Sequence, residues 1–236
     1  MAEDVLSIIP ARKGSKGIPR KNIRELDDRP LIAHAIETSK NTSEIDHTIL
    51  TTDSNEIAQI GRRYGVDDVI HRPKELATDE VPLAPVIKQA YIESGRDSDY
   101  VLCFQPTVPL ISKSSVGEGI QRGLQNNSDS VIYVKDSTHQ YWKQTNRGYE
   151  PISSDRKNRQ QMEPIYEEIG MFFSHRSLVE NGQRISDDPS FYKVDRNEGV
   201  DIDTYEDWKV AESILQRKQI VYRLTGNAET GTGHVY

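Results

Sequence analysis

The segment 8–22, which reads IIPARKGSKGIPRKN, concentrates positive charge in a protein whose formal net charge is −7. Its cations are Arg12, Lys13, Lys16, Arg20 and Lys21. Gly14 and Gly17 allow sharp turns and let main-chain amides approach a ligand, and successive loop amides form anion-binding nests. Several donors with matching countercharge suit a polyphosphate. The spacing is neither a Walker loop nor a dinucleotide-binding fingerprint, and a solvated basic turn is the alternative.

Two carboxylates, Asp201 and Asp203, lie far along the chain in GVDIDTYEDW. On a β-strand, this i, i+2 spacing would place both on one face. Paired oxygen ligands suit Mg²⁺, which binds through one or two carboxylates together with substrate phosphates. The pattern D-x-D is common, so alone it indicates a metal only weakly. Thr204 and Asp207 are expected to cap the following helix instead.

The pattern of apolar runs predicts the scaffold that must position these residues. Strands are expected at 5–9, 47–52, 69–71, 100–106, 130–135 and 169–174. Helices are expected at 31–40, 53–65 (capped by Asp53), 83–94, 114–125 and 204–218. This alternation predicts an α/β fold with three layers and a mostly parallel, Rossmann-like sheet. Ligands bind at the carboxyl ends of such strands, where the basic loop follows the first strand.

Two segments interrupt the alternation. Residues 136–168 are polar, contain Trp142 and Tyr149, and are expected to form an inserted arm with a β-hairpin. Residues 219–236 are expected to hold a strand at 220–224 and then the glycine-rich GNAETGTGHV, which resembles the opening of GT-B-type domains. We interpret this tail either as the stub of a truncated second domain or as a flexible extension.

Composition narrows the class of protein. The net charge of −7 argues against a general binder of nucleic acid or anionic membranes. Cys103 is the only cysteine, so one chain can form neither a disulfide nor a thiolate zinc site. Its place in YVLCF predicts a buried core residue. No apolar run reaches the ~18 residues of a membrane span, and the first residues lack the features of a signal peptide. We expect a soluble, cytoplasmic protein.

Five segments in order resemble the CMP-sialic acid synthetase (acylneuraminate cytidylyltransferase) family. They are IIPARKGSKGIPRKN at 8–22, HRPKELATDE at 71–80, QPTVPL at 105–110, RQQMEPIYEEIG at 159–170 and GVDIDTYEDW at 199–208. The resemblance implies a cytidylyltransferase domain over residues 1–218. It implies transfer of CMP from CTP to the anomeric hydroxyl of a nonulosonic acid, with release of pyrophosphate. It also implies Mg²⁺, with Mn²⁺ as the alternative ion, and a homodimer whose arm reaches toward the partner's active site.

The resemblance assigns roles to individual residues. The catalytic residues would be Arg12, Lys21, Asp201 and Asp203, with the two aspartates holding the metal. Nucleotide binding would fall to Arg12, Gly14, Ser15, Lys16, Gly17, Lys21, Asn22 and Arg72. Arg72 would lie near the cytosine, with a surface ion pair as its alternative role. Acceptor binding would fall to Gln105, Lys143, Arg159 and Gln160. A solvated position is the alternative for Lys143.

Departures from the family pattern leave the acceptor open. Val108 and Ile111 stand where the family usually has Ser and Arg, so loss of a polar contact near the acceptor is expected. Legionaminate or pseudaminate is therefore as plausible an acceptor as N-acetylneuraminate. Three rival functions stay open: another sugar nucleotidyltransferase using UTP or 3-deoxy-manno-octulosonate (KDO), a GT-A glycosyltransferase, and a catalytically silent nucleotide-binding module of a fusion protein.

Overall fold

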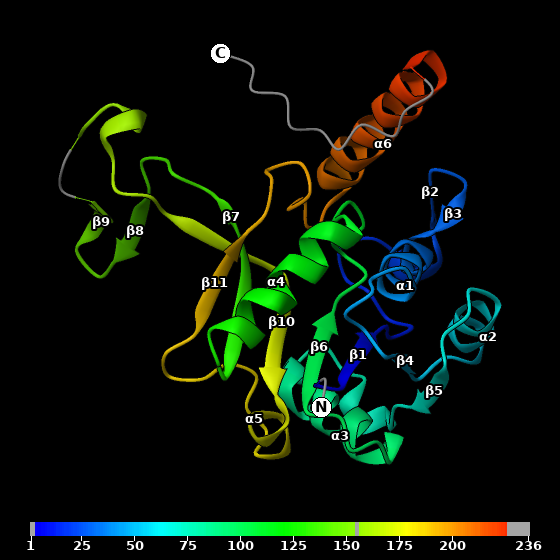
Figure 1. Cartoon of the computed structure of the whole chain (residues 1–236). Helices are drawn as coiled ribbons and strands as arrows, with labels where there is room; N and C mark the ends of the chain where they lie inside the picture. The colour runs from blue at the N-terminus through cyan, green and yellow to red at the C-terminus, as the bar shows by residue number, and fades with distance from the viewer. Residues whose placement is uncertain (1–2, 154–155, 226–236) are drawn as a thin grey trace.

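The structure is a computed structural model that describes residues 3–153 and 156–225. A seven-stranded sheet runs through its centre in the order β11-β7-β10-β6-β1-β4-β5 (Figure 1). Its strands are β1 (Val5–Pro10), β4 (His47–Thr52), β5 (Asp68–His71), β6 (Tyr100–Phe104), β7 (Ser130–Asp136), β10 (Tyr166–His175) and β11 (Ser190–Lys193). Only β10 is antiparallel to its neighbours in this sheet. The mostly parallel sheet is confirmed.

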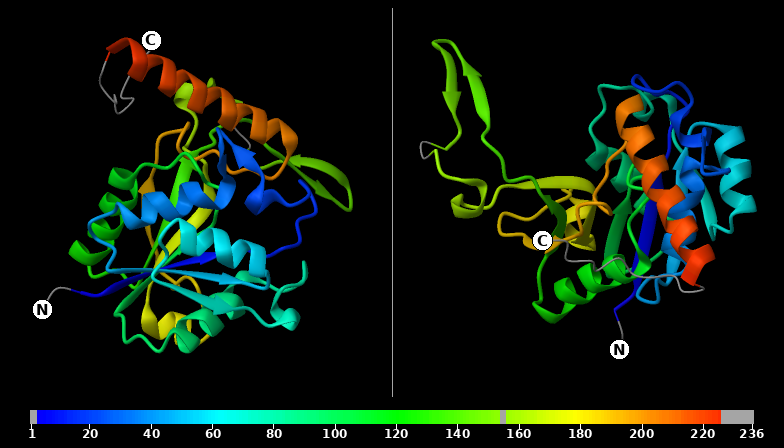
Figure 2. Two further views of the ribbon diagram at one scale, coloured as in Figure 1. Left: turned by 90° about the vertical axis from the view of Figure 1, so that its right-hand side faces the viewer. Right: turned by 90° about the horizontal axis from the view of Figure 1, so that it is seen from above.

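Helices cover both faces of the sheet (Figure 2), as the alternating pattern predicted. One face holds α1 (Leu31–Lys40), α2 (Asn55–Arg63) and α4 (Lys113–Gln125), and the other holds α3 (Leu83–Ser94) and α5 (Arg176–Glu180). Neighbouring residues of β1 serve opposite faces, because side chains alternate along a strand. Ile9 packs in the first hydrophobic cluster and Ile8 in the second. Cys103 is fully buried in the second cluster, as predicted.

A third hydrophobic cluster joins the basic loop to the segment that carries the two aspartates. Ile18 of the loop and Ile202 are both fully buried, and they belong to one cluster with Trp208 of α6 (Tyr205–Thr225). Burial of apolar surface is the main force that holds such segments together. The cluster therefore brings residues about 180 positions apart to one place in the fold.

Three local predictions were wrong. The helix α2 is capped by Ser54, whose Oγ accepts from the Ile57 amide, rather than by Asp53. Residues 201–203 are not a strand. Residues 220–224 are helical, because α6 continues through Thr225, so they form no strand. The glycine-rich segment after this helix lies outside the described residues.

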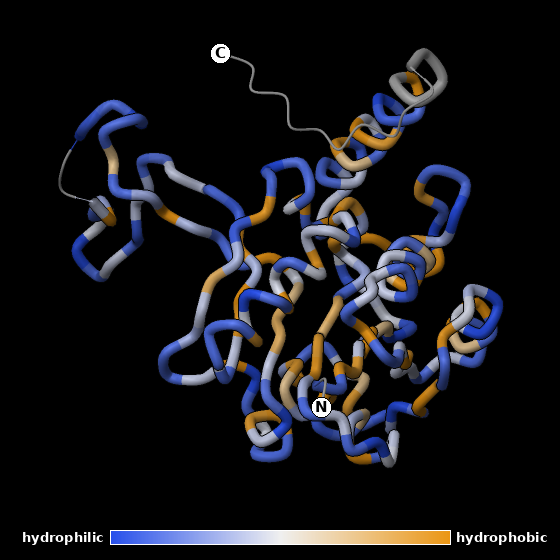
Figure 3. The backbone as a smooth tube through the Cα atoms, in the orientation of Figure 1, coloured by the Kyte–Doolittle hydropathy of each residue, from blue (hydrophilic) through white to orange (hydrophobic). Residues whose placement is uncertain are grey.

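The predicted arm holds a β-hairpin that projects from the body (Figures 1 and 2). Its strands are β8 (Trp142–Thr145) and β9 (Gly148–Pro151). Figure 3 shows that the arm is mostly hydrophilic, in contrast to the central strands. The sequence did not predict seven short elements. Two belong to the body, α5 and β11, and the others are η1 (Lys21–Ile23), β2 (Glu25–Leu26), β3 (Arg29–Pro30), η2 (Lys74–Leu76) and η3 (Arg159–Gln161). Among the described residues, no helix has both the length and the apolar character of a membrane span.

Candidate active site

A cleft of about 450 Å³ opens at the carboxyl edge of the sheet, beyond β1 and β6. This is the edge where ligands bind in open parallel sheets. Most of the predicted site residues line it: Arg12, Gly14, Ser15, Lys16, Gly17, Lys21, Asn22, Arg72, Gln105, Asp201 and Asp203. The structure therefore brings together the loop, the aspartates and the end of β6, as the sequence predicted.

The basic loop is held in shape by hydrogen bonds to its own backbone. Asn22 Nδ2 donates to the Arg12 carbonyl at 2.9 Å, which closes the loop on itself. The Lys13 amide donates to Asp53 Oδ1 at 2.8 Å, which ties the loop to the end of β4. Asp53 therefore braces the loop, whereas the sequence assigned it to a helix cap. Asn22 also lines the cleft, but one of its side-chain amide hydrogens is used in the bond to the Arg12 carbonyl.

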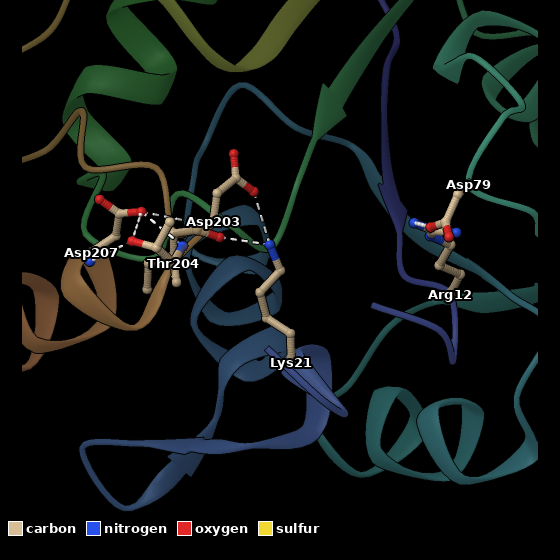
Figure 4. Close-up of polar contacts among 7 residues, drawn as sticks. Arg12, Lys21, Asp79, Asp203, Thr204 and Asp207 are labelled. Carbon is tan, nitrogen blue, oxygen red and sulfur yellow. Dashed lines mark hydrogen bonds and ion pairs between the residues drawn. The ribbon is translucent and has the colours of Figure 1, made fainter. Parts of the chain in front are cut away.

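Lys21 connects the loop to the aspartate segment (Figure 4). Its Nζ donates to the Ile202 carbonyl at 2.6 Å and to Asp203 Oδ1 at 3.1 Å. A β-carbon added to Gly17 would lie only 2.2 Å from the Asp203 carbonyl oxygen. The backbone of the loop thus touches the backbone of the aspartate segment, and glycine is required at this contact.

Asp201 is the half-buried member of the carboxylate pair. Its Oδ1 is buried and has no hydrogen-bond partner. Burial raises the pKa of the Asp201 carboxyl, and the neighbouring charge of Asp203 acts in the same direction. A bound cation would satisfy the orphaned oxygen and favour the ionised form, so the residue fits a metal ligand.

Asp203 offers the second carboxylate, with a side chain that is 78% exposed toward solvent. Within the described chain, no group of three or more His, Cys, Asp or Glu side chains could hold a metal. A cation here would therefore be held by two aspartates and by oxygens of the substrate. That donor set suits Mg²⁺, which keeps substrate phosphates and water in its shell.

The residues after the aspartates form the predicted helix cap. Asp207 Oδ2 accepts from the Thr204 amide at 2.8 Å, and the Asp207 amide donates to Thr204 Oγ1 at 3.2 Å. This reciprocal pair is a capping box at the start of α6. Figure 4 shows Asp207 engaged with Thr204 while Asp203 faces Lys21. The cap leaves Asp201 and Asp203 as the carboxylates available to a ligand.

Arg72 is buried in the wall of the cleft, with only 4% of its surface exposed. Its Nη2 donates to the Thr51 carbonyl at 3.0 Å, and its Nε has no partner. Burial lowers the pKa of Arg72 to about 10, which keeps the guanidinium charged at neutral pH. The alternative of a surface ion pair is wrong for this residue. A buried cation with an unsatisfied donor fits a ligand-binding role.

Of the four residues assigned to the acceptor, only Gln105 lines the cleft. Lys143 lies on the arm and pairs with Glu150 across the hairpin at 3.7 Å. Arg159 and Gln160 lie in η3, where Arg159 Nη2 is 3.9 Å from Asp136 Oδ2. These three residues do not reach the cleft of their own chain.

Val108 and Ile111, the apolar departures from the family pattern, are buried in the core. They are not part of the cleft wall. The apolar side chains at these two positions are therefore accommodated by packing in the core beneath the site.

Sequence reasoning missed Thr107 and Asp79, which also line the cleft. Gly170 packs against this wall, because an added β-carbon would lie 3.0 Å from Gln105 Cβ and 3.2 Å from Thr107 Oγ1. Asp79 contacts Arg12, and Arg12 holds the pKa of Asp79 below its ordinary value. Both residues lie inside the segments QPTVPL and HRPKELATDE, so the signal was present in the motifs.

Comparison with known proteins decides the family. The profile described as "Cytidylyltransferase" matches residues 6–163. The chain belongs to this cytidylyltransferase family.

Among curated relatives of this cytidylyltransferase is the pseudaminic acid cytidylyltransferase of Campylobacter jejuni. It is 29% identical over 222 residues, covering 89% of this chain and 96% of the relative. The CMP-N,N'-diacetyllegionaminic acid synthase of Legionella pneumophila is 27% identical over 231 residues, covering 91% of this chain and 97% of the relative. The chain is thus similar to these proteins over nearly their whole length.

Solved structures share the fold of this cytidylyltransferase. A CMP:2-keto-3-deoxy-manno-octonic acid synthetase complexed with CTP gives a TM-score of 0.71 at 14% identity, covering 91% of this chain and 99% of that one. A 4-diphosphocytidyl-2C-methyl-D-erythritol synthase gives 0.69 at 12% identity, with the same coverage of 91% and 99%. The Rossmann-like nucleotidyltransferase fold is confirmed.

Proposed function

We propose that this protein transfers CMP from CTP to the anomeric hydroxyl of a nonulosonic acid and releases pyrophosphate. The observation that carries the proposal is the joining of two ligand sets in one cleft, where Lys21 Nζ of the basic loop lies 3.1 Å from Asp203 Oδ1. A loop for phosphates beside carboxylates for a cation suits a metal nucleoside triphosphate. The names of the relatives support CTP as donor and a pseudaminic or legionaminic acid as acceptor.

The main requirement on the cleft is to neutralise the negative charge of both substrates and of the leaving pyrophosphate. An anionic acid must approach an anionic triphosphate, and further charge develops on the pyrophosphate as the bond to the α-phosphate breaks. Arg12 and Lys16 line the cleft on the loop and would neutralise the departing phosphates. Lys21, fixed between Ile202 and Asp203, would supply positive charge at a set position. Positioning and electrostatic stabilisation account for most of the catalysis in phosphoryl transfer.

Asp201 and Asp203 are the residues that would hold Mg²⁺. When bound, the metal would neutralise the α-phosphate and lower the pKa of the attacking hydroxyl. The orphaned Oδ1 of Asp201 supports this assignment, because an unpartnered buried oxygen is costly without a ligand. Mn²⁺ takes the same oxygen ligands and is the alternative ion.

Gln105 is the acceptor residue placed in the same cleft. Lys143, on the projecting arm, would serve the cleft of a second copy in a homodimer. Its distance from its own cleft supports that arrangement, as do the exposed Trp142 and Tyr149 on the hairpin, at 49% and 71%. Exposed aromatic side chains are common at protein interfaces. A cytoplasmic location is part of the proposal and rests on the single, buried cysteine.

Pyrophosphate release tests the proposal directly. The wild-type protein is assayed with CTP, UTP, ATP and GTP, each with pseudaminic, legionaminic and N-acetylneuraminic acids and with 3-deoxy-manno-octulosonate. We expect release with CTP and a nine-carbon acid, in the presence of Mg²⁺. Asp203→Asn should abolish release, whereas Asp188→Asn, an exposed residue outside the cleft, should leave it unchanged. No release with CTP and any nine-carbon acid would refute the proposal, and release only with the octulosonate would favour the rival substrate.

A further inference from the structure

Asp79 lies across the cleft from the basic loop, in the segment between η2 and α3. Its Oδ1 contacts Arg12 Nη2, and its Oδ2 lies 3.4 Å from Lys16 Nζ. Arg12 Nη1 also donates to the Ala77 carbonyl at 3.5 Å. Figure 4 shows the Arg12 and Asp79 side chains facing each other, away from the pair formed by Lys21 and Asp203. Each wall of the cleft therefore contributes to one ionic bridge.

The geometry of this bridge resembles the binding of a phosphate group. Two oxygens of one anion engage two different cations, and guanidinium donors suit carboxylate and phosphate alike. Arg12 holds the pKa of Asp79 below its ordinary value, and Lys16 acts in the same direction, so the carboxylate is charged at neutral pH. The Asp79 side chain is 32% exposed, so an anion from solvent can reach the cations and replace it.

We propose that Asp79 is an internal competitor, whose carboxylate competes with phosphate groups for Arg12 and Lys16. The inference rests on the proposed function, because it takes these two cations to be ligands of the CTP phosphates. Any phosphate ligand must displace the Asp79 carboxylate, and its apparent affinity falls by the fraction of molecules in which the bridge is closed. This cost falls equally on CTP and on pyrophosphate. CTP keeps the contacts of its base and ribose and still binds, whereas pyrophosphate, which has no such groups, is released more readily.

Calorimetric titration of CTP and of inorganic pyrophosphate tests this competition without any turnover. Asp79→Asn removes the charge at constant size, and Asp79→Ser replaces the whole carboxylate with a shorter, neutral hydroxyl. We expect both variants to bind pyrophosphate and CTP about three- to tenfold more tightly, the range for loss of two partly exposed ion pairs. Inhibition of the reaction by added pyrophosphate should be stronger in both variants than in the wild type, by the same factor. Glu80→Gln, the matched control, removes one exposed charge next to the bridge and should bind like wild type.

The outcomes separate this inference from the proposed function. If the wild type binds CTP and pyrophosphate but the Asp79 variants bind no more tightly, the competition is refuted and the proposed function stands. Equal tightening in Glu80→Gln would also refute it, since general charge would then explain the effect. If the wild type binds neither compound, the proposed function fails and this inference fails with it.

Discussion

Gly17 and Gly14 lie three positions apart in the same loop, yet their surroundings differ completely. A β-carbon on Gly17 would meet the Asp203 carbonyl at 2.2 Å, whereas one on Gly14 would meet nothing within 4 Å. The obstacle at Gly17 is backbone, which cannot turn aside as a flexible side chain can. Gly17 is thus the residue through which the loop contacts the aspartate segment, whereas Gly14 borders the open space of the cleft.

Gly17→Ala should separate the loop from the aspartate segment. The displacement would pull Lys21 away from Asp203, and a shift of about 1 Å in a catalytic group can cost on the order of 100-fold in rate. We therefore expect kcat with CTP and the acceptor to fall by roughly that factor. Steady-state kinetics checks this, and the melting temperature reports any loss of fold. Wild-type kcat in Gly17→Ala would contradict the role of the close contact.

Arg72 carries a second prediction at this scale. Replacing it with Met keeps most of the buried volume but removes the charge and the donor to the Thr51 carbonyl. We expect CTP binding to weaken by at least about tenfold, because a charged hydrogen bond in a buried site is worth about that much. Titration with CTP measures it, and the melting temperature reports any loss of fold. Unchanged affinity in a folded variant would remove Arg72 from the nucleotide site.

The sequence predicted most cleft residues because they lie in motifs at the ends of predicted strands. It assigned the cap of α2 to Asp53, although the true cap is Ser54 and Asp53 accepts from the Lys13 amide. Two adjacent polar residues before a helix cannot be told apart as caps from the sequence pattern. Asp79 was missed because its role depends on which loop lies opposite, and that follows from tertiary packing. The contact of Gly17 with Asp203 joins segments 186 positions apart, so no local pattern can reveal it.

Among the elements, the short β2–β3 hairpin is attached to α1 by one buried histidine. His34 is 5% exposed, and its Nε2 lies 2.9 Å from the Leu26 carbonyl, to which the neutral ring can donate. Leu26 belongs, with Leu31 and Ile18, to the hydrophobic cluster that supports the basic loop. The hairpin was not predicted from the sequence, because its strands are two residues each. The helical structure of 220–224 was missed for another reason. Its β-branched residues are weak helix formers and suggested a strand, but a helix that has already formed can extend through them.

His34 gives this part of the fold a dependence on pH. Burial lowers the pKa of His34 below its ordinary value. The unfolded chain therefore binds more protons than the folded one as the pH falls through the ordinary histidine pKa of about 6.5. The free energy of unfolding should therefore decrease between pH 7.5 and pH 5.5. His34→Gln keeps an N–H donor without a titrating group and should flatten that decrease. Urea denaturation at the two pH values checks this, with the exposed His71→Gln as control. Equal slopes in wild type and His34→Gln would contradict it.

For the whole molecule, the arm is the part that one chain leaves unexplained. It carries three large apolar side chains, Trp142, Tyr149 and Ile152, that are 49%, 71% and 61% exposed. It also carries Lys143, away from the cleft that it was predicted to serve. The proposed homodimer, in which each arm would reach the other copy's cleft, would account for both facts. The sequence could predict the arm from its polar character, but a residue acting in a partner's site leaves no local pattern.

Mixing two inactive variants tests this arrangement. Lys143→Ala removes the arm residue and Asp203→Asn removes the cleft residue, so each homodimer should be inactive. In a mixed dimer, the cleft of the Lys143→Ala subunit meets the intact arm of the Asp203→Asn subunit, and that one site is complete. Random exchange at equal amounts should therefore restore about a quarter of the wild-type activity, since half of the dimers are mixed and each has one complete site. If Lys143 served its own chain, no mixture would contain a complete site, and the activity would stay at the level of the separate variants.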